Sequence, residues 1–404
     1  MDTREDRGMQ IAEVSQIVRD GTEWVVPSQS GHGAYRVNLE AQTCNCPDHE
    51  VRHTHCKHII AAEIVFKRET APDGTVVETR AARITYAQDW PAYNAAQTEE
   101  RDRVTALLGE LCASIPQPIQ TAGRPRLPLS DMLFAAVMKV YTGFSSRRFA
   151  SDMREACRSG RIAKAPHFNS VSNYMADPDI TPLLRELVTT SSLPMRVIET
   201  DFAVDSSGFG TSRFVRWFNK KYGREIDNRE WVKVHLMCGV QTHIVTSVEV
   251  SGWTAHDTAY FAPLLATTAE HFRIGDVSAD KAYLSRRNLA LVEQAGGVPF
   301  VPFKSNTVVP QGDSAWTRMY HYFAYNRETF LEHYHQRSNV ETVFSMIKAK
   351  FGDSVRSKSD TGMVNESLAK VLCHNLCVVN QAIHEFGIDP TFCAGSAVAQ
   401  KQAV

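Results

Sequence analysis

The spacing of apolar residues changes several times along the chain, and each change marks a predicted element. Residues 24–26 and 35–37 alternate as strands do, and the glycine- and serine-rich turn between them predicts a hairpin. Residues 59–66 carry apolar side chains at helical spacing. Residues 99–192 show the same spacing over most of their length, and residues 129–141 are apolar on most faces. We therefore expect a helical region built around one buried helix.

Strand-like patterns dominate after residue 195. Three of them follow one another, with Gln241 and Thr242 as a tight turn between the last two, at residues 197–204, 231–240 and 243–250. Further helices and strands are predicted at residues 258–272, 276–279, 285–294, 298–303, 334–350 and 366–383. Successive strands followed by alternating helices and strands predict an α/β domain with a mixed sheet.

These patterns predict six regions: an N-terminal arm, a small ββα module, a linker with some strand character, an all-α region, an α/β domain and a C-terminal tail. Their boundaries are expected at residues 1–21, 22–66, 67–96, 97–192, 193–386 and 387–404. A chain of 404 residues has room for two or three domains and at least one full hydrophobic core. The predicted fold class is α/β, with the all-α region and the small module preceding the mixed-sheet domain.

The composition is that of a soluble globular protein, with 43% apolar and 22% charged residues. We find neither a run of about 18 apolar residues nor a signal peptide, and so we expect a cytoplasmic protein. The net charge of −1 excludes no class of partner. Its distribution is more informative, because residues 123–168 contain nine basic and three acidic residues.

This local excess of positive charge predicts contacts with the phosphates of nucleic acid, although solvated helical surfaces carry similar excesses. The sequence Gly-Arg-Pro-Arg at residues 123–126 is also open to two interpretations. It suits a hook for the minor groove, and it equally suits an ordinary loop between helices. The candidates for phosphate contact are Arg124, Arg126, Arg147 and Arg148.

Cysteine and histidine form two pairs, Cys44 with Cys46 and Cys56 with His58. Three thiolates and one imidazole suit a closed, tetrahedral Zn²⁺ site, and a metal is favoured over disulfides in the cytoplasm. One zinc ion would stabilise a module with a small core, whose task is then to bind DNA or protein. The pattern resembles a SWIM zinc finger. Alternative ligands lie between the pairs: His49, His53 and His55.

The predicted helix at residues 334–350 has two distinct faces. Its apolar stripe consists of Val340, Val343, Phe344 and Ile347. About a quarter turn away is a polar row of Tyr334, Arg337, Glu341 and Lys348. A carboxylate between cations suits a metal ion beside a phosphate backbone, with Glu341 as ligand and the cations contacting phosphate. Alternatively, Glu341 is a surface glutamate that pairs with Arg337, four residues before it.

A metal-binding Glu341 requires further carboxylates, because Mg²⁺ sites use several oxygen ligands. Asp205 and Asp280 are candidates, since each is predicted to end a strand of the same sheet. Asp201 competes with Asp205, which is favoured by the Ser-Ser-Gly turn that follows it. If Asp205, Asp280 and Glu341 converge, they can hold two divalent cations, Mg²⁺ or Mn²⁺, about 3.5–4 Å apart.

The polar row also has the spacing Y-(2)-R-(3)-E-(6)-K, and in this respect the chain resembles the bacterial insertion-sequence DDE transposases. The sequences that begin at Asp205 and Asp280 resemble the contexts of that family's catalytic aspartates. The resemblance covers residues 195–385 and implies a ribonuclease H-like fold. It also implies metal-dependent cleavage and joining of DNA strands by Asp205, Asp280 and Glu341.

Further expectations follow from the resemblance. The expected partner is double-stranded DNA, both as the terminal repeats of the element and as the target. The protein would form a homodimer in the DNA complex and would be located at the bacterial nucleoid. A non-catalytic DNA-binding derivative and a nuclease of the same fold are alternative functions. His256 and Asp257 either shape a loop or touch DNA, and Lys304 either contacts phosphate or extends from a strand end into solvent.

Overall fold

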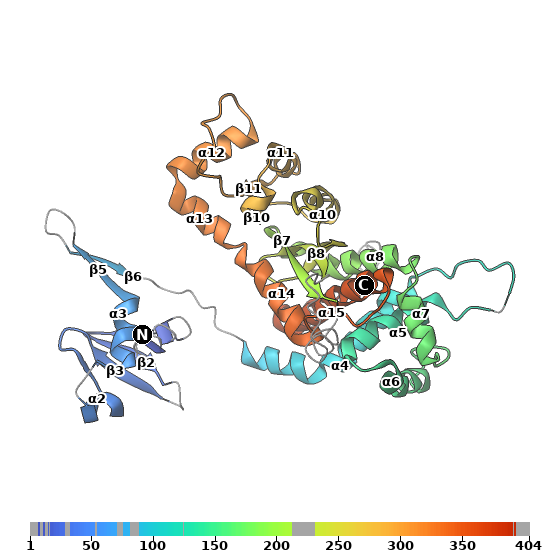
Figure 1. Cartoon of the computed structure of the whole chain (residues 1–404). Helices are drawn as coiled ribbons and strands as arrows, with labels where there is room; N and C mark the ends of the chain where they lie inside the picture. Colours follow the sequence, from blue (N-terminus) through green and yellow to red (C-terminus); the bar gives the residue numbers. More distant parts are fainter. Residues whose placement is uncertain are drawn as a thin grey trace, which may run out of the picture. The chain divides into compact units, whose positions relative to one another are not determined.

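The computed structural model describes residues 7–8, 11–12, 15, 17–28, 33–52, 55–70, 76–80, 89–123, 125–211, 231–390 and 392. The chain folds as two compact units, Met1–Gln88 and Asp89–Val404 (Figure 1). Within the described part of the chain, no helix is long and apolar enough to cross a membrane.

A four-stranded antiparallel sheet forms the first unit, in the order β1-β2-β3-β4. Trp24 and Val26 of β2 are buried, and Trp24 pairs with the buried Val37 of β3, which confirms the predicted hairpin. Helix α3 confirms the helix predicted near residues 59–66, whereas the short α2 between the two cysteine pairs was not predicted. The elements are β1 (Val18–Asp20), β2 (Glu23–Pro27), β3 (Ala34–Asn38), β4 (Thr43–Cys44), α2 (Pro47–Arg52), α3 (Lys57–Val65), β5 (Phe66–Thr70) and β6 (Val76–Arg80).

The second unit begins with a helical layer. Helix α5 is buried at every position from Met132 to Met138, as its apolar sequence predicts. Helix α6 is amphipathic, because it buries Phe149, Met153 and Ala156 and exposes basic residues on its other side. The helices are α4 (Trp90–Ala113), α5 (Leu129–Thr142), α6 (Ser146–Arg158), α7 (Phe168–Met175) and α8 (Ile180–Ser192), followed by the 3₁₀ helix η1 (Leu193–Val197).

A five-stranded mixed sheet follows, in the order β11-β10-β7-β8-β9. Strands β7, β8 and β9 pair antiparallel, while β10 runs parallel to β7 and to β11. The predicted α/β class with a ribonuclease H-like mixed sheet is therefore confirmed. The strands are β7 (Phe202–Gly210), β8 (Trp231–Gly239), β9 (Val245–Gly252), β10 (Asp276–Ala279) and β11 (Val298–Phe300).

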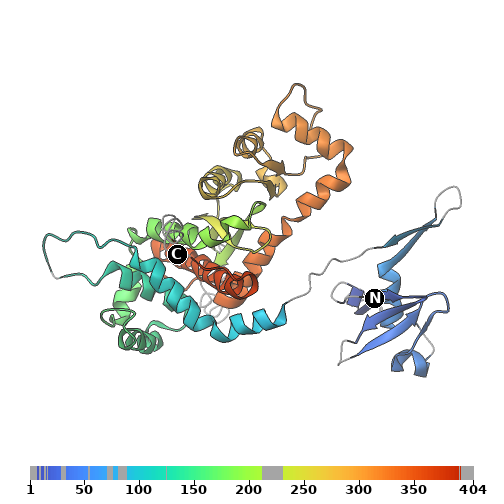
Figure 2. The same cartoon turned by 180° about the vertical axis from the view of Figure 1, so that it is seen from behind.

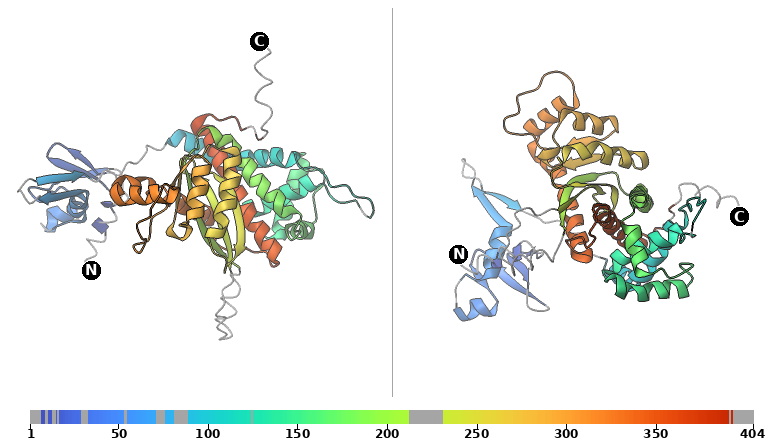
Figure 3. Two further views of the ribbon diagram at one scale, coloured as in Figure 1. Left: turned by 90° about the horizontal axis from the view of Figure 1, so that it is seen from above. Right: turned by 45° about the vertical axis from the view of Figure 1, so that its right-hand side comes forward.

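The central strand β7 sends alternate side chains into two different cores. Phe202 and Val204 pack with α10 (Thr258–His271) and α11 (Arg286–Gln294). Ala203 and Phe209 belong to a larger core with the long helix α15 (Asp360–Phe386), which also contacts α4, α5 and α8 (Figure 2). Figure 3 shows α10 and α15 on opposite sides of the sheet. The same alternation places Asp205 on the face of α15 and Ser206 on the face of α10.

The predicted continuous helix over residues 334–350 is wrong at its beginning. The chain instead forms α13 and a separate α14, with Tyr334 on the first and Glu341 and Lys348 on the second. Arg337 is the N-cap of α14. The remaining elements of this region are η2 (Lys281–Tyr283), α12 (Ala315–Tyr325), α13 (Arg327–His335) and α14 (Ser338–Phe351).

Backbone and side-chain hydrogen bonds explain the interruption. The N–H groups of Gln336 and Arg337 donate to carbonyls three residues back, which tightens the turn to a 3₁₀ geometry. The Ser338 hydroxyl donates to the His335 carbonyl, and the Asn339 amide donates to that of Gln336. Short polar side chains that compete for backbone carbonyls in this way interrupt helices.

Candidate functional site

The predicted zinc ligands come together in the first unit. Cys44 ends β4, Cys46 directly precedes α2, Cys56 directly precedes α3, and His58 lies in the first turn of α3. Their ligand atoms all lie within 4.8 Å of one another, and all four residues are buried. Cys56 Sγ lies 3.9 Å from His58 Nδ1. Bond lengths of about 2.3 Å to sulfur and about 2.0 Å to nitrogen require similar separations around tetrahedral zinc.

Electrostatics also suit a metal at this cluster. Contact with the Cys44 thiol, ahead of contact with His58, lowers the pKa of Cys56 to about 3 against the effect of burial. The same contact raises the pKa of Cys44, and burial raises that of Cys46, so that Cys56 is the thiolate of the cluster without metal. A thiolate is the form that binds zinc. Of the alternative ligands, His49 and His55 lie outside the cluster, and His53 is outside the described residues. The donor set therefore fits one structural zinc ion held by the two predicted pairs.

In the second unit, the sheet register brings the two aspartates together. Ala279 of β10 pairs with Val204 of β7 in parallel, so that Asp280 and Asp205, the next residues along the chain, lie side by side. Asp280 directly follows β10, as predicted. The prediction that Asp205 ends its strand is wrong, because the Ser-Ser-Gly expected as a turn pairs with β8 and β7 continues to Gly210. Burial raises the pKa of Asp205, and the negative charges of Asp280 and Glu341 raise it further. The Ser206 N–H donates to Asp205 Oδ1 at 2.8 Å and opposes this shift.

Arg337 links strand β7 to helix α14. Its Nη1 donates to Asp205 Oδ2 at 2.9 Å, and its Nη2 donates to Glu341 Oε1 at 2.6 Å. The Tyr334 ring supports the guanidinium from 6.0 Å. Although Tyr334 lies on a different helix from Glu341, Arg337 therefore still connects the two. In this structure Arg337 contacts two carboxylates, whereas phosphate was the predicted contact. Its pair with Glu341 is the alternative that the sequence also allowed, and its contact with Asp205 was not predicted.

Lys348 makes separate contacts with β7. Its Nζ donates to the Ser207 hydroxyl at 2.6 Å and lies 5.6 Å from the centre of the Phe209 ring. Burial lowers the pKa of this lysine. The signature residues therefore hold α14 against the central strand at two points, one at each end of the helix.

Comparisons with known proteins agree with this geometry. Residues 198–376 match the family model of the transposase DDE domain, and residues 35–67 match that of the SWIM zinc finger. The chain combines a transposase DDE domain with a SWIM zinc finger. No curated protein and no solved structure matches it. The DDE domain match begins before β7 and ends within α15, and it includes Asp205, Asp280 and Glu341.

The carboxylates of the DDE domain are more loosely arranged than the zinc ligands. In the described part of the chain, only the cysteine–histidine cluster brings three or more ligand atoms within 4.8 Å. Between Asp205 and Glu341 lies the Arg337 guanidinium, a positive group bonded to both. Carboxylates whose mutual repulsion is relieved by a cation at this position fit divalent metal binding.

Asp201, the competing carboxylate, is placed differently. It precedes β7, and its Oδ1 accepts the N–H of Asp276 at 2.9 Å. The Thr200 hydroxyl donates to the same oxygen at 3.4 Å. These contacts fix the beginning of β10 beside β7 and are far along the strand from Arg337.

Asp257 is the centre of a hydrogen-bond network on the face of β7 opposite to Asp205. It receives hydrogen bonds from the Ser206 hydroxyl at 2.9 Å and from Lys233 Nζ at 2.5 Å. His235 is buried beside it and stacks on Tyr260 at 4.1 Å between ring centres. Sequence analysis singled out Asp257 but missed Ser206, Lys233 and His235, although alternate positions on two strands of one sheet face could have suggested them.

The basic candidates lie in the helical layer. Arg126, Arg147 and Arg148 are exposed, and Lys304 is exposed after β11, while Arg124 is outside the described residues. Nearby acidic groups are already paired, because Asp152 bonds to Arg101 at 2.5 Å and Glu155 bonds to Arg158 at 2.8 Å. The positive charge of this surface is therefore available to an anionic partner.

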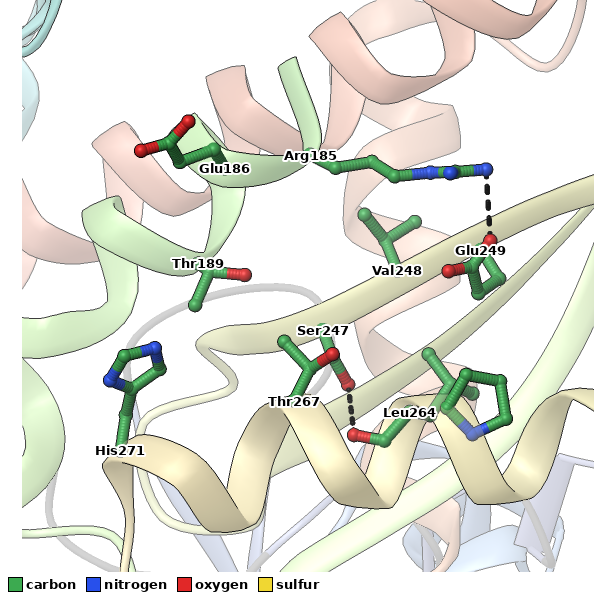
Figure 4. A pocket seen from close by; sticks show the side chains of 10 residues that line it. Arg185, Glu186, Thr189, Ser247, Val248, Glu249, Leu264, Thr267 and His271 are labelled. Atoms are coloured by element: carbon green, nitrogen blue, oxygen red, sulfur yellow. Dashed lines mark hydrogen bonds and ion pairs between the residues drawn. The ribbon is translucent and has the colours of Figure 1, made fainter. Parts of the chain in front are cut away.

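A cavity of about 240 Å³ lies between α8, β9 and α10, on the far side of β8 from Asp205 (Figure 4). The Arg185–Glu249 ion pair at 2.9 Å borders it. None of the signature residues lines this cavity. Its lining consists of Arg185, Glu186, Thr189, Ser247, Val248, Glu249, Pro263, Leu264, Thr267 and His271.

Proposed function

We propose that the protein is an active transposase that binds the terminal inverted repeats of its element and cuts and joins DNA strands. Asp205, Asp280 and Glu341 are the catalytic carboxylates in this proposal. The observation that carries it is the link from Asp205 through Arg337 to Glu341, beside Asp280, within a DDE domain.

The three carboxylates would hold two Mg²⁺ or Mn²⁺ ions, which when bound polarise a phosphodiester and activate water or a 3′-hydroxyl. Asp205 and Asp280 are fixed by neighbouring strands, and the Ser206 N–H orients Asp205. The Glu341 side chain is 57% exposed, and so a metal ion that also binds a phosphate group could reach it. Arg337 holds the two carboxylates at a common position before the charge of the metal and DNA arrives.

DNA binding is assigned to the helical region of residues 97–192, whose exposed cations suit phosphates. The zinc finger would contact DNA or a protein of the same complex. Two element ends must be held together during strand transfer, and we therefore propose a homodimer in the DNA complex. The reaction would take place on DNA at the nucleoid.

The test is excision of a marker flanked by the element's own ends, in Mg²⁺. We expect wild type to excise the marker and Glu341→Gln to lose excision while still binding the ends. Glu332→Gln, at an exposed glutamate of α13, is the matched control and should retain excision.

Excision by Glu341→Gln would disprove the assignment of the triad. If wild type binds the ends but never excises, the protein is a non-catalytic DNA-binding derivative. Cleavage of RNA–DNA hybrids without excision would instead identify a nuclease of the same fold.

A further inference from the structure

Helix α7 presents a narrow polar stripe to solvent. Asn169, Ser172, Asn173 and the C-cap residue Ala176 follow one another at offsets of 0, 3, 4 and 7, which places them on one helical face. All four are exposed, whereas Val171 and Met175 are buried beneath the helix against the core. The stripe has no charged residue and no large apolar side chain.

Cations flank this helix. Arg147 lies 5.8 Å from the centre of the Phe168 ring at the beginning of α7. Arg126 lines a small hollow together with Tyr174 near the end of the helix. The hydroxyl of Ser146, which begins α6, is 3.3 Å from that of Ser172 and ties the two helices together. Two of the residues predicted to contact phosphate therefore lie on either side of one short polar helix.

The surroundings of α7 extend this positive surface. Exposed basic residues continue along α6 and the loop before α7: Arg148, Arg154, Arg161 and Lys164. Such a surface is complementary to a polyanion. A protein partner is less well suited, because the stripe lacks the aromatic or large apolar side chains that dominate binding at protein interfaces.

The chemistry of the stripe matches the edges of base pairs. An asparagine amide pairs with N6 and N7 of adenine, a serine hydroxyl bonds to several bases, and an alanine methyl group packs on the methyl group of thymine. An α-helix with its side chains is about 10–12 Å across, which matches the width of the major groove, about 12 Å. Flanking cations would contact phosphates and fix the register of the helix in the groove.

We infer that α7 enters the major groove of the element's end DNA and reads its sequence with Asn169 and Asn173. This inference rests on the proposed function, since it names the part of the helical region that provides sequence specificity. In this inference, α7 recognises the DNA sequence, and the basic residues around it contact phosphates and position α7.

The experiment measures binding of the full chain to two duplexes at one salt concentration. One duplex is selected by the wild-type protein from a random-sequence pool, and the other is its scrambled version. The variants are Asn169→Ala, Asn173→Ala and Arg148→Ala, with Gln97→Ala, at an exposed amide on α4, as the matched control.

We expect each asparagine variant to weaken binding to the selected duplex by about 5- to 150-fold and to leave binding to the scrambled duplex unchanged. Arg148→Ala should weaken binding to both duplexes alike and make binding less salt-dependent. Gln97→Ala should change neither.

Unchanged preference in both asparagine variants, or an equal loss on both duplexes, would overturn the role of α7. That outcome leaves the proposed function intact as long as wild type still prefers the selected duplex. If the pool yields no preferred sequence at all, or if the selected sequence is absent from the element ends, the proposed recognition of terminal repeats fails instead.

Discussion

The zinc site and the carboxylate site of this chain solve different physical problems. The four zinc ligands come from 15 consecutive positions and are at most 5% exposed. The carboxylates come from positions as distant as 205 and 341, and their side chains are 22% and 57% exposed. Burial on all sides leaves a metal no open position, whereas partial exposure leaves room for a substrate.

The manner in which each site is held together differs as well. The ligand atoms of Cys44, Cys46, Cys56 and His58 all lie within 4.8 Å of one another, so that a bound zinc ion would complete the fold of the small unit. Asp205 and Glu341 are instead joined through Arg337, and their positions are set by the sheet and by α14. The first site should therefore determine stability, and the second should determine activity.

The largest expected effect is the loss of zinc. In Cys56→Ser, the zinc content of the purified full chain should fall from one ion to none, and residues 1–88 should become sensitive to protease. Structural zinc contributes on the order of 10 kcal/mol to modules of this size. The melting temperature of the DDE domain should not change.

Cys157→Ser is the control for this experiment, because Cys157 is a free thiol in α6 outside the cluster. It should retain one zinc ion. Full zinc content in Cys56→Ser would show that the four-ligand site is wrong.

The next effect concerns two carboxylates of the DDE domain with the same chemistry and different neighbours. Asp205→Asn should reduce strand cleavage by about 1,000-fold, because the removed charge is needed for metal binding and several kcal/mol of transition-state stabilisation are lost with it. Asp201→Asn retains an oxygen for the Asp276 N–H and should cleave at nearly the wild-type rate. The assay is cleavage of end DNA in Mg²⁺, and equal losses in both variants would contradict the assignment.

The zinc ligands are close together in the sequence and the carboxylates are far apart, and this difference decides how much of each site the sequence predicts. The zinc ligands could be named from spacing because few residues separate them and no tertiary structure is needed to bring them together. Both Asp205 and Asp280 were predicted as strand ends, but only Asp280 follows its strand, whereas Asp205 lies within β7. The adjacency of the two aspartates depends on the parallel pairing of β10 with β7. The strand order β11-β10-β7-β8-β9 is set by packing on both faces of the sheet, which periodicity does not reveal.

Two features of the candidate site could not be predicted from the sequence pattern: the break between α13 and α14, and the contact of Arg337 with Asp205. Helical periodicity continues through Ser338 and Asn339, yet their side chains bond to backbone carbonyls where α13 ends and α14 begins. Arg337 was expected to contact phosphate, and only the tertiary structure shows that Asp205 lies within its reach. Tyr334 therefore acts from α13, Glu341 and Lys348 act from α14, and Arg337 acts from the turn between the two helices.

Low pH should destabilise the DDE domain because its buried histidine side chains resist protonation in the folded state. Burial lowers the pKa of His374 from 6.5 to about 4, although its bond to the His243 carbonyl opposes this. Between these values the unfolded chain binds more protons than the folded one, so that stability falls as the pH falls below 6.5. The slope is at most about 1.4 kcal/mol per pH unit for each such histidine.

His374→Gln should therefore flatten the dependence of the free energy of unfolding on pH between 6.5 and 4. His235, whose pKa burial also lowers to about 4, should still contribute, and we expect the slope to fall by about half. The measurement is chemical denaturation of the full chain across this pH range, followed by a probe in the DDE domain. An unchanged slope in the variant would mean that His374 is not the group that titrates.

The smallest effect tests whether the carboxylate site needs support that the zinc site does not. Ser206 connects Asp257 to Asp205. Its hydroxyl donates a hydrogen bond to Asp257, and its backbone N–H donates to Asp205 Oδ1. Asp257→Ala should lower strand cleavage by about 10- to 100-fold, the usual cost of losing a group that orients a metal ligand. If the support passes through Ser206, the double variant with Ser206→Ala should cleave no more slowly than Asp257→Ala alone. Multiplied losses in the double variant would show that Asp257 acts by another route, of which Lys233 at 2.5 Å is the first to examine.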